Sequence, residues 1–226
     1  MSSLAVTLLN MSKNRQLKNA SNRHCNENPK MGYHHGDLQQ VLMAEAAKII
    51  REEGEAALSM RKLAIRTGVS RTAPYHHFKD KQGLLCAIAE EGFRRFDLII
   101  ESTTEEDDLL QHLHRKMRDY VNFATDHPEY YNLMFSSRIW TSTDISQSLK
   151  EKAYESFHVY TDSVSRSCQQ AQLPDGVTSL RIAQLSWSTF HGLSRLMIDG
   201  IYLDKTAFEA IFETASQLLE PLVKQP

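Results

Sequence analysis

Hydrophobic residues recur at helical spacing along most of the chain. Between Asp37 and Glu53 they keep a 3.6-residue period, with Asp37 placed to cap a helix and Gly54 placed to end it. Beyond residue 102 no stretch alternates polar and apolar residues as a half-buried strand would. Helical patterns there cover 104–125, 129–135, 143 or 144 to 172, 178–199 and 204–219. The pattern predicts an all-α protein of about nine helices.

The stretch from Ser59 to Lys81 is predicted to form two short helices joined by a tight turn. Ser59 can cap the first helix, and Gly68 supplies the positive φ that a sharp reversal needs. Ser70 follows the turn as the cap of the second helix, whose exposed N-terminal end carries Arg71. This arrangement is typical of a helix-turn-helix, in which the second helix enters the DNA major groove.

Pro74 lies in the first turn of that second helix. It removes a backbone donor and crowds the carbonyl of Ser70. We expect either that the cap moves one residue later or that the first turn is distorted, and both would redirect Arg71. The next helix opens near Lys81 and runs to about Glu101, with its N-terminal N–H groups available to a phosphate.

The formal net charge of −2 conceals a difference between the two parts of the chain. Residues 1–82 hold 13 Lys and Arg against 7 Asp and Glu, whereas residues 83–226 hold 13 against 21. A basic N-terminal module can neutralise phosphates, and an acidic remainder is repelled by DNA. The charge distribution therefore favours a DNA-binding head followed by an acidic body.

The head resembles the DNA-binding signature of the TetR family of transcriptional regulators. The residues that carry the resemblance are Leu63-Ala64, Gly68-Val69-Ser70, Tyr75, His77-Phe78 and Lys81, within a match over about Gly32 to Phe96. Downstream, Trp187 followed by His191-Gly192 resembles the Trp…His-Gly signature (WHG-type) of one branch of that family. Pro74 departs from the Leu or Ile that most members carry. The resemblance implies a homodimeric repressor that a small molecule releases from a palindromic operator, and the lack of a secretory signal predicts a cytoplasmic location.

The recognition helix supplies the candidate base-reading residues. Arg71 is predicted to read guanine, and Thr72 and Ala73 are predicted to contact base edges or methyl groups. The other candidate DNA-binding residues, mostly phosphate contacts, are Ser59, Arg61, Ser70, Tyr75, His76, Lys79 and Lys81.

Large apolar and aromatic side chains are frequent in the body, and most must fill its core. A subset is predicted to line an effector pocket: Met117, Tyr120, Phe123, Met134, Phe135, Trp187 and His191. Trp187, His191 and Arg195 are spaced by four and share one helix stripe, where a lone His is more often a hydrogen-bonded core residue than a ligand contact. Gly192 inside this helix indicates close approach of another helix or a ligand.

The last two predicted helices carry further apolar faces. In proteins that this chain resembles, such helices pair with their copies, which predicts a dimer interface; burial within one chain is the alternative. The candidate interface residues are Ile182, Leu185, Leu193, Leu196, Phe208, Ile211, Phe212 and Leu219.

These observations divide the chain into a disordered extension (1–32), a helix-turn-helix domain (33–82) and a ligand-binding and dimerisation domain (83–226). The sequence holds no Gly-rich phosphate loop after a strand, no nucleophile elbow and no metal triad, so we expect no enzyme, no metal and no cofactor. The three cysteines are expected to be reduced, and we expect no secretory signal and no membrane contact. Two alternatives stay open: a ligand-responsive activator, and a helical protein-interaction module without specific DNA binding.

Overall fold

The computed structural model describes residues 35–101, 108–169, 171–201 and 205–223. All regular structure in these ranges is helical, which confirms the all-α prediction. The predicted N-terminal extension, 1–32, lies outside the described residues, as does Asp204, the predicted cap of the final helix.

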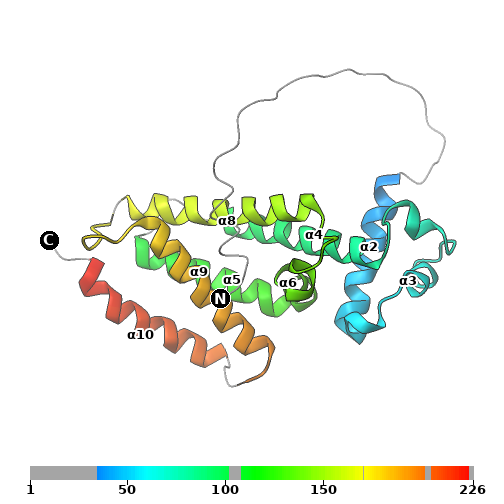
Figure 1. Cartoon of the computed structure of the whole chain (residues 1–226). Helices are drawn as coiled ribbons and strands as arrows, with labels where there is room; N and C mark the ends of the chain where they lie inside the picture. Colours follow the sequence, from blue (N-terminus) through cyan, green and yellow to red (C-terminus); the bar gives the residue numbers. More distant parts are fainter. Residues whose placement is uncertain (1–34, 102–107, 170, 202–204, 224–226) are drawn as a thin grey trace, which may run out of the picture.

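A small helical head occupies one end of the molecule (Figure 1). It consists of α2 (His35–Glu53), the 3₁₀ helix η1 (Glu55–Ala57), α3 (Met60–Arg66) and the 3₁₀ helix η2 (Ala73–His76). Helix α2 begins two residues before Asp37, the predicted cap. Leu42, Ile49, Leu63 and Phe78 are buried and hold these elements together.

Helix α4 (Lys81–Glu101) leaves the head and runs into the body (Figure 1). Its first turn is capped by Asp80, whose Oδ1 accepts a hydrogen bond from the Gly83 N–H at 2.8 Å. Leu84, Leu85 and Ile88 near its start and Phe93 and Phe96 further along are all buried. One continuous helix therefore belongs to the cores of both parts.

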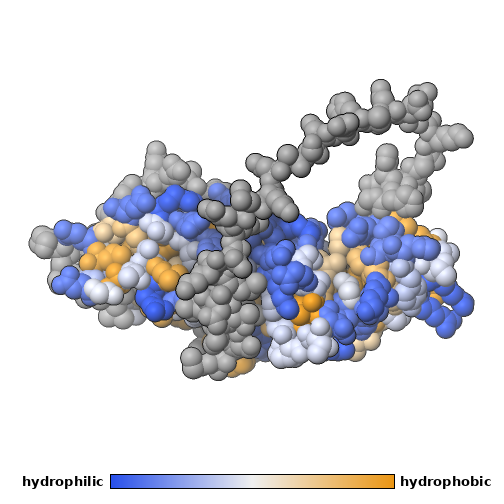
Figure 2. Space-filling model, turned by 45° about the horizontal axis from the view of Figure 1, so that its top comes forward, coloured by the Kyte–Doolittle hydropathy of each residue, from blue (hydrophilic) through white to orange (hydrophobic). Residues whose placement is uncertain are grey.

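The body is built from the remaining helices. They are α5 (Leu109–Asp126), α6 (Pro128–Met134), α7 (Ser137–Trp140), α8 (Gln147–Cys168), α9 (Ser179–Ile198) and α10 (Lys205–Val223). Helix α8 lies along α4, and α9 and α10 both contact α5 (Figure 1). In Figure 2, hydrophobic residues are visible on the end of the body far from the head.

Several predicted helix boundaries are wrong. Helix α8 starts at Gln147 because Ser146 caps it by accepting from the Leu149 N–H at 3.3 Å, and it ends at Cys168. The short α7 was not predicted, since four residues are too few to show a period. Helix α10 continues through Pro221 to Val223.

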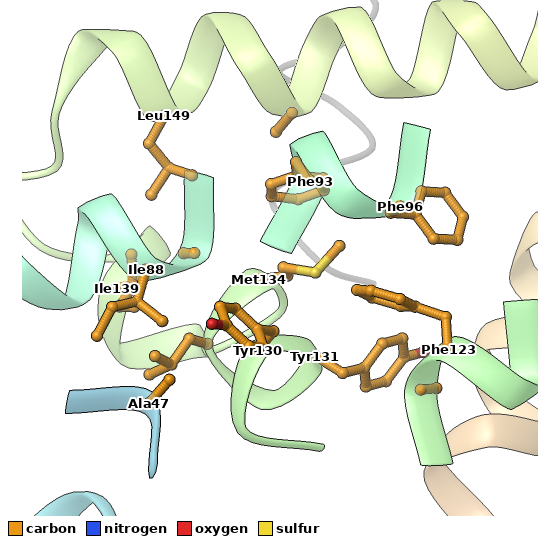
Figure 3. Close-up of a cluster of buried hydrophobic side chains, with 14 of the residues drawn as sticks. Ala47, Ile88, Phe93, Phe96, Phe123, Tyr130, Tyr131, Met134, Ile139 and Leu149 are labelled. Atoms are coloured by element: carbon orange, nitrogen blue, oxygen red, sulfur yellow. The ribbon is translucent and has the colours of Figure 1, made fainter. Parts of the chain in front are cut away.

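Helix α6 packs closely on α4 (Figure 3). A Cβ atom at Gly92 of α4 would lie 2.8 Å from the Sδ and 2.9 Å from the Cγ of Met134, and 3.2 Å from the Cβ of Tyr130. Gly92 thus allows the close approach that the sequence led us to expect at Gly192. The expectation of a neighbouring helix is wrong within the described residues, because a Cβ at Gly192 would meet nothing within 4 Å, whereas close approach of a ligand stays a prediction.

Candidate DNA-binding surface and effector-binding core

Helix α3 and the turn after it follow the predicted geometry. Ser59 caps α3 by accepting a hydrogen bond from the Lys62 N–H at 3.1 Å. The Thr67 hydroxyl donates to the Leu63 carbonyl at 2.8 Å, and Gly68 takes a φ of 71°. The chain can reverse here because glycine has no side chain to oppose a positive φ.

The recognition segment differs from the α-helix that was predicted. Residues 71 and 72 form a turn, and η2 extends only from Ala73 to His76. Ser70 still acts as a cap, since its Oγ accepts from the Ala73 N–H at 3.2 Å. Pro74 has no N–H to donate to Ser70, which accounts for the distorted first turn. Of the two outcomes expected at Pro74, the structure has the distorted turn.

The predicted DNA-contacting residues lie together on this part of the head, but they are not equally accessible. Ala73 and Lys81 are partly buried, and the Lys81 ammonium donates to the Glu55 carbonyl of η1 at 2.8 Å. The Thr72 hydroxyl lies 3.1 Å from that of Ser70. The exposed members of the set are Ser59, Arg61, Ser70, Arg71, Thr72, Tyr75, His76 and Lys79.

Ion pairs divide the cations of the head into two groups. Arg66 bonds Glu45 at 2.7 Å and Glu52 at 3.1 Å, and Lys62 bonds Glu53 at 2.5 Å, so both cross-link α3 to α2. The hydrogen bonds to Glu45 and Glu52 raise the pKa of the Arg66 guanidinium, and the hydrogen bond from Lys62 lowers the pKa of Glu53.

The second group is free to meet a phosphate or a base. Arg61, Arg71 and Lys79 form no ion pair with any residue that the structure describes. The DNA-binding residues predicted from the sequence include these three and not Lys62 or Arg66. The ion pairs that separate the two groups are not visible in the sequence. Of these three cations, Arg61 lies at the start of α3, and Arg71 and Lys79 lie on either side of η2.

Two ion pairs join the head to the body. Arg51 of α2 lies 3.8 Å from Glu129, a buried carboxylate at the start of α6. Arg138 of α7 lies 3.0 Å from Glu55 of η1. Helix α6 thus contacts both α2 and α4, so a displacement of α6 would reach the head by two routes.

The predicted pocket residues belong to the core of the body or border it. Met117, Tyr120, Phe123 and Met134 are buried there, and Phe135, Trp187 and His191 are partly buried. Trp187 packs edge-on against Phe96 and Tyr120, with ring centroids 5.5 and 5.4 Å apart. These side chains fill the core with aromatic contacts.

A separate shallow hollow lies on the surface. Its volume is about 100 Å³, and its lining residues are Arg118, Val121, Asn122, Thr125, Met197, Phe208 and Glu209. Apart from Phe208, predicted for the dimer interface, these residues belong to none of the predicted sites. The predicted pocket residues are packed against one another elsewhere, so a ligand among them would have to displace side chains.

His191 forms hydrogen bonds within the core of the body. Its Nδ1 lies 2.7 Å from the Tyr131 hydroxyl and 3.4 Å from the Tyr120 hydroxyl. Burial lowers the pKa of His191, and the nearby charge of Arg195 adds to the effect. Sequence reasoning missed Tyr131, because helical spacing relates residues within one helix and Tyr131 belongs to α6.

The predicted dimer residues fall into two sets. Leu193 and Phe208 are buried within the chain, and Ile182 and Ile211 pack against the core. Phe212 is partly buried and stacks on His114 at a centroid distance of 3.8 Å. By contrast, Leu185 is 70% exposed; Leu196 is partly exposed, and the side chain of Leu219 lies outside the described residues. Among the described residues, nothing fully covers Leu185 and Leu196 of α9.

Two further observations concern only the described residues. They contain no group of three or more His, Cys, Asp or Glu side chains that could hold a metal ion. None of their helices combines the length and the apolar character needed to cross a lipid bilayer.

The fold and the site define a helix-turn-helix protein with a basic head and a helical body, the architecture of a DNA-binding regulator. Residues 42–88 match the family model "Bacterial regulatory proteins, tetR family", and residues 113–219 match the model "Tetracyclin repressor-like, C-terminal domain". The chain belongs to the TetR family of DNA-binding regulators, which is a family of transcriptional regulators and not of enzymes.

Individual relatives agree with this assignment. The chain is 32% identical over 99 residues to the nucleoid occlusion factor SlmA of Aliivibrio fischeri, over 42% of this chain and 49% of SlmA. It is 34% identical over 62 residues to the repressor AcnR of Corynebacterium glutamicum, over 27% of this chain and 33% of AcnR. The matches thus span half or less of these curated relatives. A solved structure from Rhodococcus sp. RHA1, of unknown function, is 30% identical with a TM-score of 0.70, covering 87% of this chain and all of that one.

Proposed function

We propose that the chain is a homodimeric repressor that binds a palindromic DNA operator and is released by a small molecule. The observation that carries the proposal is the sorting of charges in the head: Lys62 and Arg66 are neutralised by α2, whereas Arg71 and Lys79 stay unpaired and exposed beside η2. Unpaired cations on either side of a recognition element are suited to guanine edges and phosphates.

Within this proposal each exposed residue has a role. Arg71 reads a guanine, Thr72 and Ala73 contact neighbouring base edges, and Lys79 binds phosphate, with Arg61, Tyr75 and His76 along its flanks. Ser59 and Ser70 act chiefly as caps. The Lys81 ammonium donates one hydrogen bond to the Glu55 carbonyl, which stabilises the head, and its other N–H groups can bind a phosphate.

The exposed Leu185 and the partly exposed Leu196 are the basis for a dimer through α9 and α10. Two heads related by a two-fold axis would meet half-sites about 34–36 Å apart, or a multiple of that distance. An effector that binds the body more tightly in a conformation with another head spacing would shift the population away from DNA. The contacts of α6 with α2 and α4 provide a path for that shift.

Three finer assignments belong to the same proposal. Trp187, His191 and Gly192 support the WHG-type branch, and the continuity of α4 supports a division near residue 82 into a DNA-binding domain and a ligand-binding domain. The third assignment is a cytoplasmic location, where the chain would meet its DNA operator. The repressor AcnR among the relatives supports repression over activation.

The test is selection of bound duplexes from a random DNA pool, at low and moderate salt. We expect an enriched palindrome. Arg71→Ala should lose preference at one base position per half-site and cost about 1–3 kcal/mol there. Arg94→Ala is the matched control, because it removes the same charge from the exposed surface of α4, where Arg94 pairs with Glu90 and Glu91.

Four results would contradict the proposal in different ways. Equal losses by Arg71→Ala on operator and random DNA would remove Arg71 from base reading. Binding without enrichment, lost steeply with salt, would leave a phosphate-binding head only. Absence of DNA binding at low salt would favour the protein-interaction module. An enriched operator whose occupancy rises with the effector would favour the activator.

A further inference from the structure

The centre of the body contains a polar pair enclosed by aromatic rings. The Tyr131 hydroxyl and His191 Nδ1 are 2.7 Å apart, with the Tyr120 hydroxyl 3.3 Å from that of Tyr131. The Phe135 ring lies edge-on to His191, with centroids 4.6 Å apart. The polar groups of this cluster, defined as Tyr120, Tyr131, Phe135 and His191, are thus hydrogen-bonded to one another among aromatic rings, and the buried Ser194 lies beside the Tyr131 hydroxyl.

The cluster is closed on one side and open on the other. Tyr120 and Tyr131 are fully buried, whereas Phe135 and His191 are only partly buried. A ligand could reach the pair from the side of Phe135 and His191 by turning the Phe135 ring, and Tyr120 and Tyr131 would form the floor. Phe135 lies just after α6, the helix that contacts the head, so its displacement acts where the body meets the head.

The ionic groups near the cluster are already engaged. Arg195 bonds the Asn132 side chain at 2.6 Å and Asp199 at 2.5 Å. Asp97 pairs with Lys152 at 2.7 Å, and the ammonium of the buried Lys116 donates to the Ile100 carbonyl at the end of α4. The Arg195 charge acts on both Tyr131 and His191, but its guanidinium is already held by Asp199 and Asn132. A ligand carboxylate placed on the cluster would lose its hydration and would have to compete with Asp199 for that cation.

The hydrogen-bonding groups of the cluster itself are neutral. Burial lowers the pKa of the His191 imidazole, so the ring is uncharged at neutral pH. Burial likewise keeps the Tyr120 and Tyr131 hydroxyls protonated by raising their pKa. Such a site can exchange hydrogen bonds with a hydroxyl or carbonyl group, and its ring surfaces suit a flat aromatic body.

We infer that the effector is an uncharged aromatic compound with a hydroxyl or carbonyl group, which inserts beside Phe135 and takes over the hydrogen bond between Tyr131 and His191. This inference rests on the proposed function, since it gives the chemical class of the proposed effector. It excludes fatty acids and other carboxylates as the preferred ligands of this cluster.

The test compares two probes that share one ring system and differ in charge. Isothermal titration calorimetry at pH 7 measures the binding of 2-naphthol, which is uncharged there, and of 2-naphthoate, which is an anion. We expect 2-naphthol to bind at least tenfold more tightly. Tyr131→Phe, which keeps the ring and removes the hydroxyl, should weaken 2-naphthol about tenfold.

Tyr160→Phe is the matched control. Its hydroxyl is also buried and hydrogen-bonded, but to Ser186 at 2.6 Å and not to His191, so 2-naphthol affinity should change less than twofold. Near-ultraviolet circular dichroism of both variants establishes that the aromatic core is intact. A third variant, His191→Phe, removes the partner nitrogen and should weaken 2-naphthol as Tyr131→Phe does.

Equal or tighter binding of 2-naphthoate would overturn the inference, and so would the absence of 2-naphthol binding at millimolar concentration. An equal effect of Tyr131→Phe and Tyr160→Phe would place the ligand elsewhere. DNA selection on the same preparation separates these failures from failure of the proposed function. If a palindrome is enriched while 2-naphthol does not bind, the regulator stands and the ligand class is wrong; if no sequence is enriched, the regulator itself is wrong.

Discussion

Gly92 offers a sharp test of the packing between α4 and α6. An alanine Cβ would lie 2.8 Å from the Met134 Sδ and 3.2 Å from the Tyr130 Cβ. The Met134 side chain can move away, but the Tyr130 Cβ is fixed to the backbone of α6, so the helix itself must shift. Overpacking of this kind costs about 1–3 kcal/mol. Replacing glycine by alanine in a helix interior stabilises the helix by about 1 kcal/mol. We therefore expect Gly92→Ala to lower the free energy of unfolding by about 0–2 kcal/mol.

Gly83→Ala isolates the crowding term because it makes the same substitution in the same helix. A Cβ there would have one neighbour, the Asp80 Oδ1, at an ordinary 3.7 Å. The two variants should therefore differ by about 1–3 kcal/mol, or several degrees in melting temperature for a chain of this size. Thermal unfolding followed by circular dichroism at one fixed protein concentration measures the difference. If Gly92→Ala is as stable as Gly83→Ala, the close packing of α6 on α4 is wrong.

The buried ion pair and the buried histidine give two further predictions. Lys152→Met should destabilise by about 3–5 kcal/mol in urea unfolding, because it leaves the buried Asp97 without its partner at 2.7 Å, and adding Asp97→Leu should recover most of the loss; an unchanged midpoint for Lys152→Met would contradict this. Burial lowers the pKa of His112 to about 4, below its value of 6.5 in the unfolded chain, so its stabilising contribution is complete above pH 6.5 and is lost as the pH falls toward 4. His112→Gln should flatten the fall in stability over that range, leaving the part that His191 contributes; a slope identical to that of the unchanged chain would refute the assignment.

Local features of the head could be predicted from the sequence because the interactions that fix them lie within a few residues. The Ser59 cap joins residues three apart, and the turn at Gly68 depends on one positive φ. Pro74 was equally local, and a distorted first turn was among its expected effects. Helix propensity alone, however, did not predict that the missing N–H of Pro74 would leave a 3₁₀ helix where an α-helical recognition helix was expected.

The body illustrates the limit of the same reasoning. A period of 3.6 residues places Trp187, His191 and Arg195 on one stripe, but it cannot say what faces the stripe. The partner of His191 is Tyr131, 60 residues earlier in the chain, and that of Arg195 is Asn132. The sequence also shows a glycine in two helices without showing that Gly92 is crowded and Gly192 is open.

The charge asymmetry that first indicated a DNA-binding head gains a more specific meaning from the structure. Counting Lys and Arg treats all cations of the head as equal, whereas the ion pairs with α2 assign Lys62 and Arg66 to holding α3 in place. Because Lys62 and Arg66 are neutralised on the side of α3 that faces α2, Arg71 and Lys79 beside η2 remain as unpaired positive charges. The same ion pairs that stabilise the head therefore leave Arg71 and Lys79 as the cations available to DNA phosphates on that side.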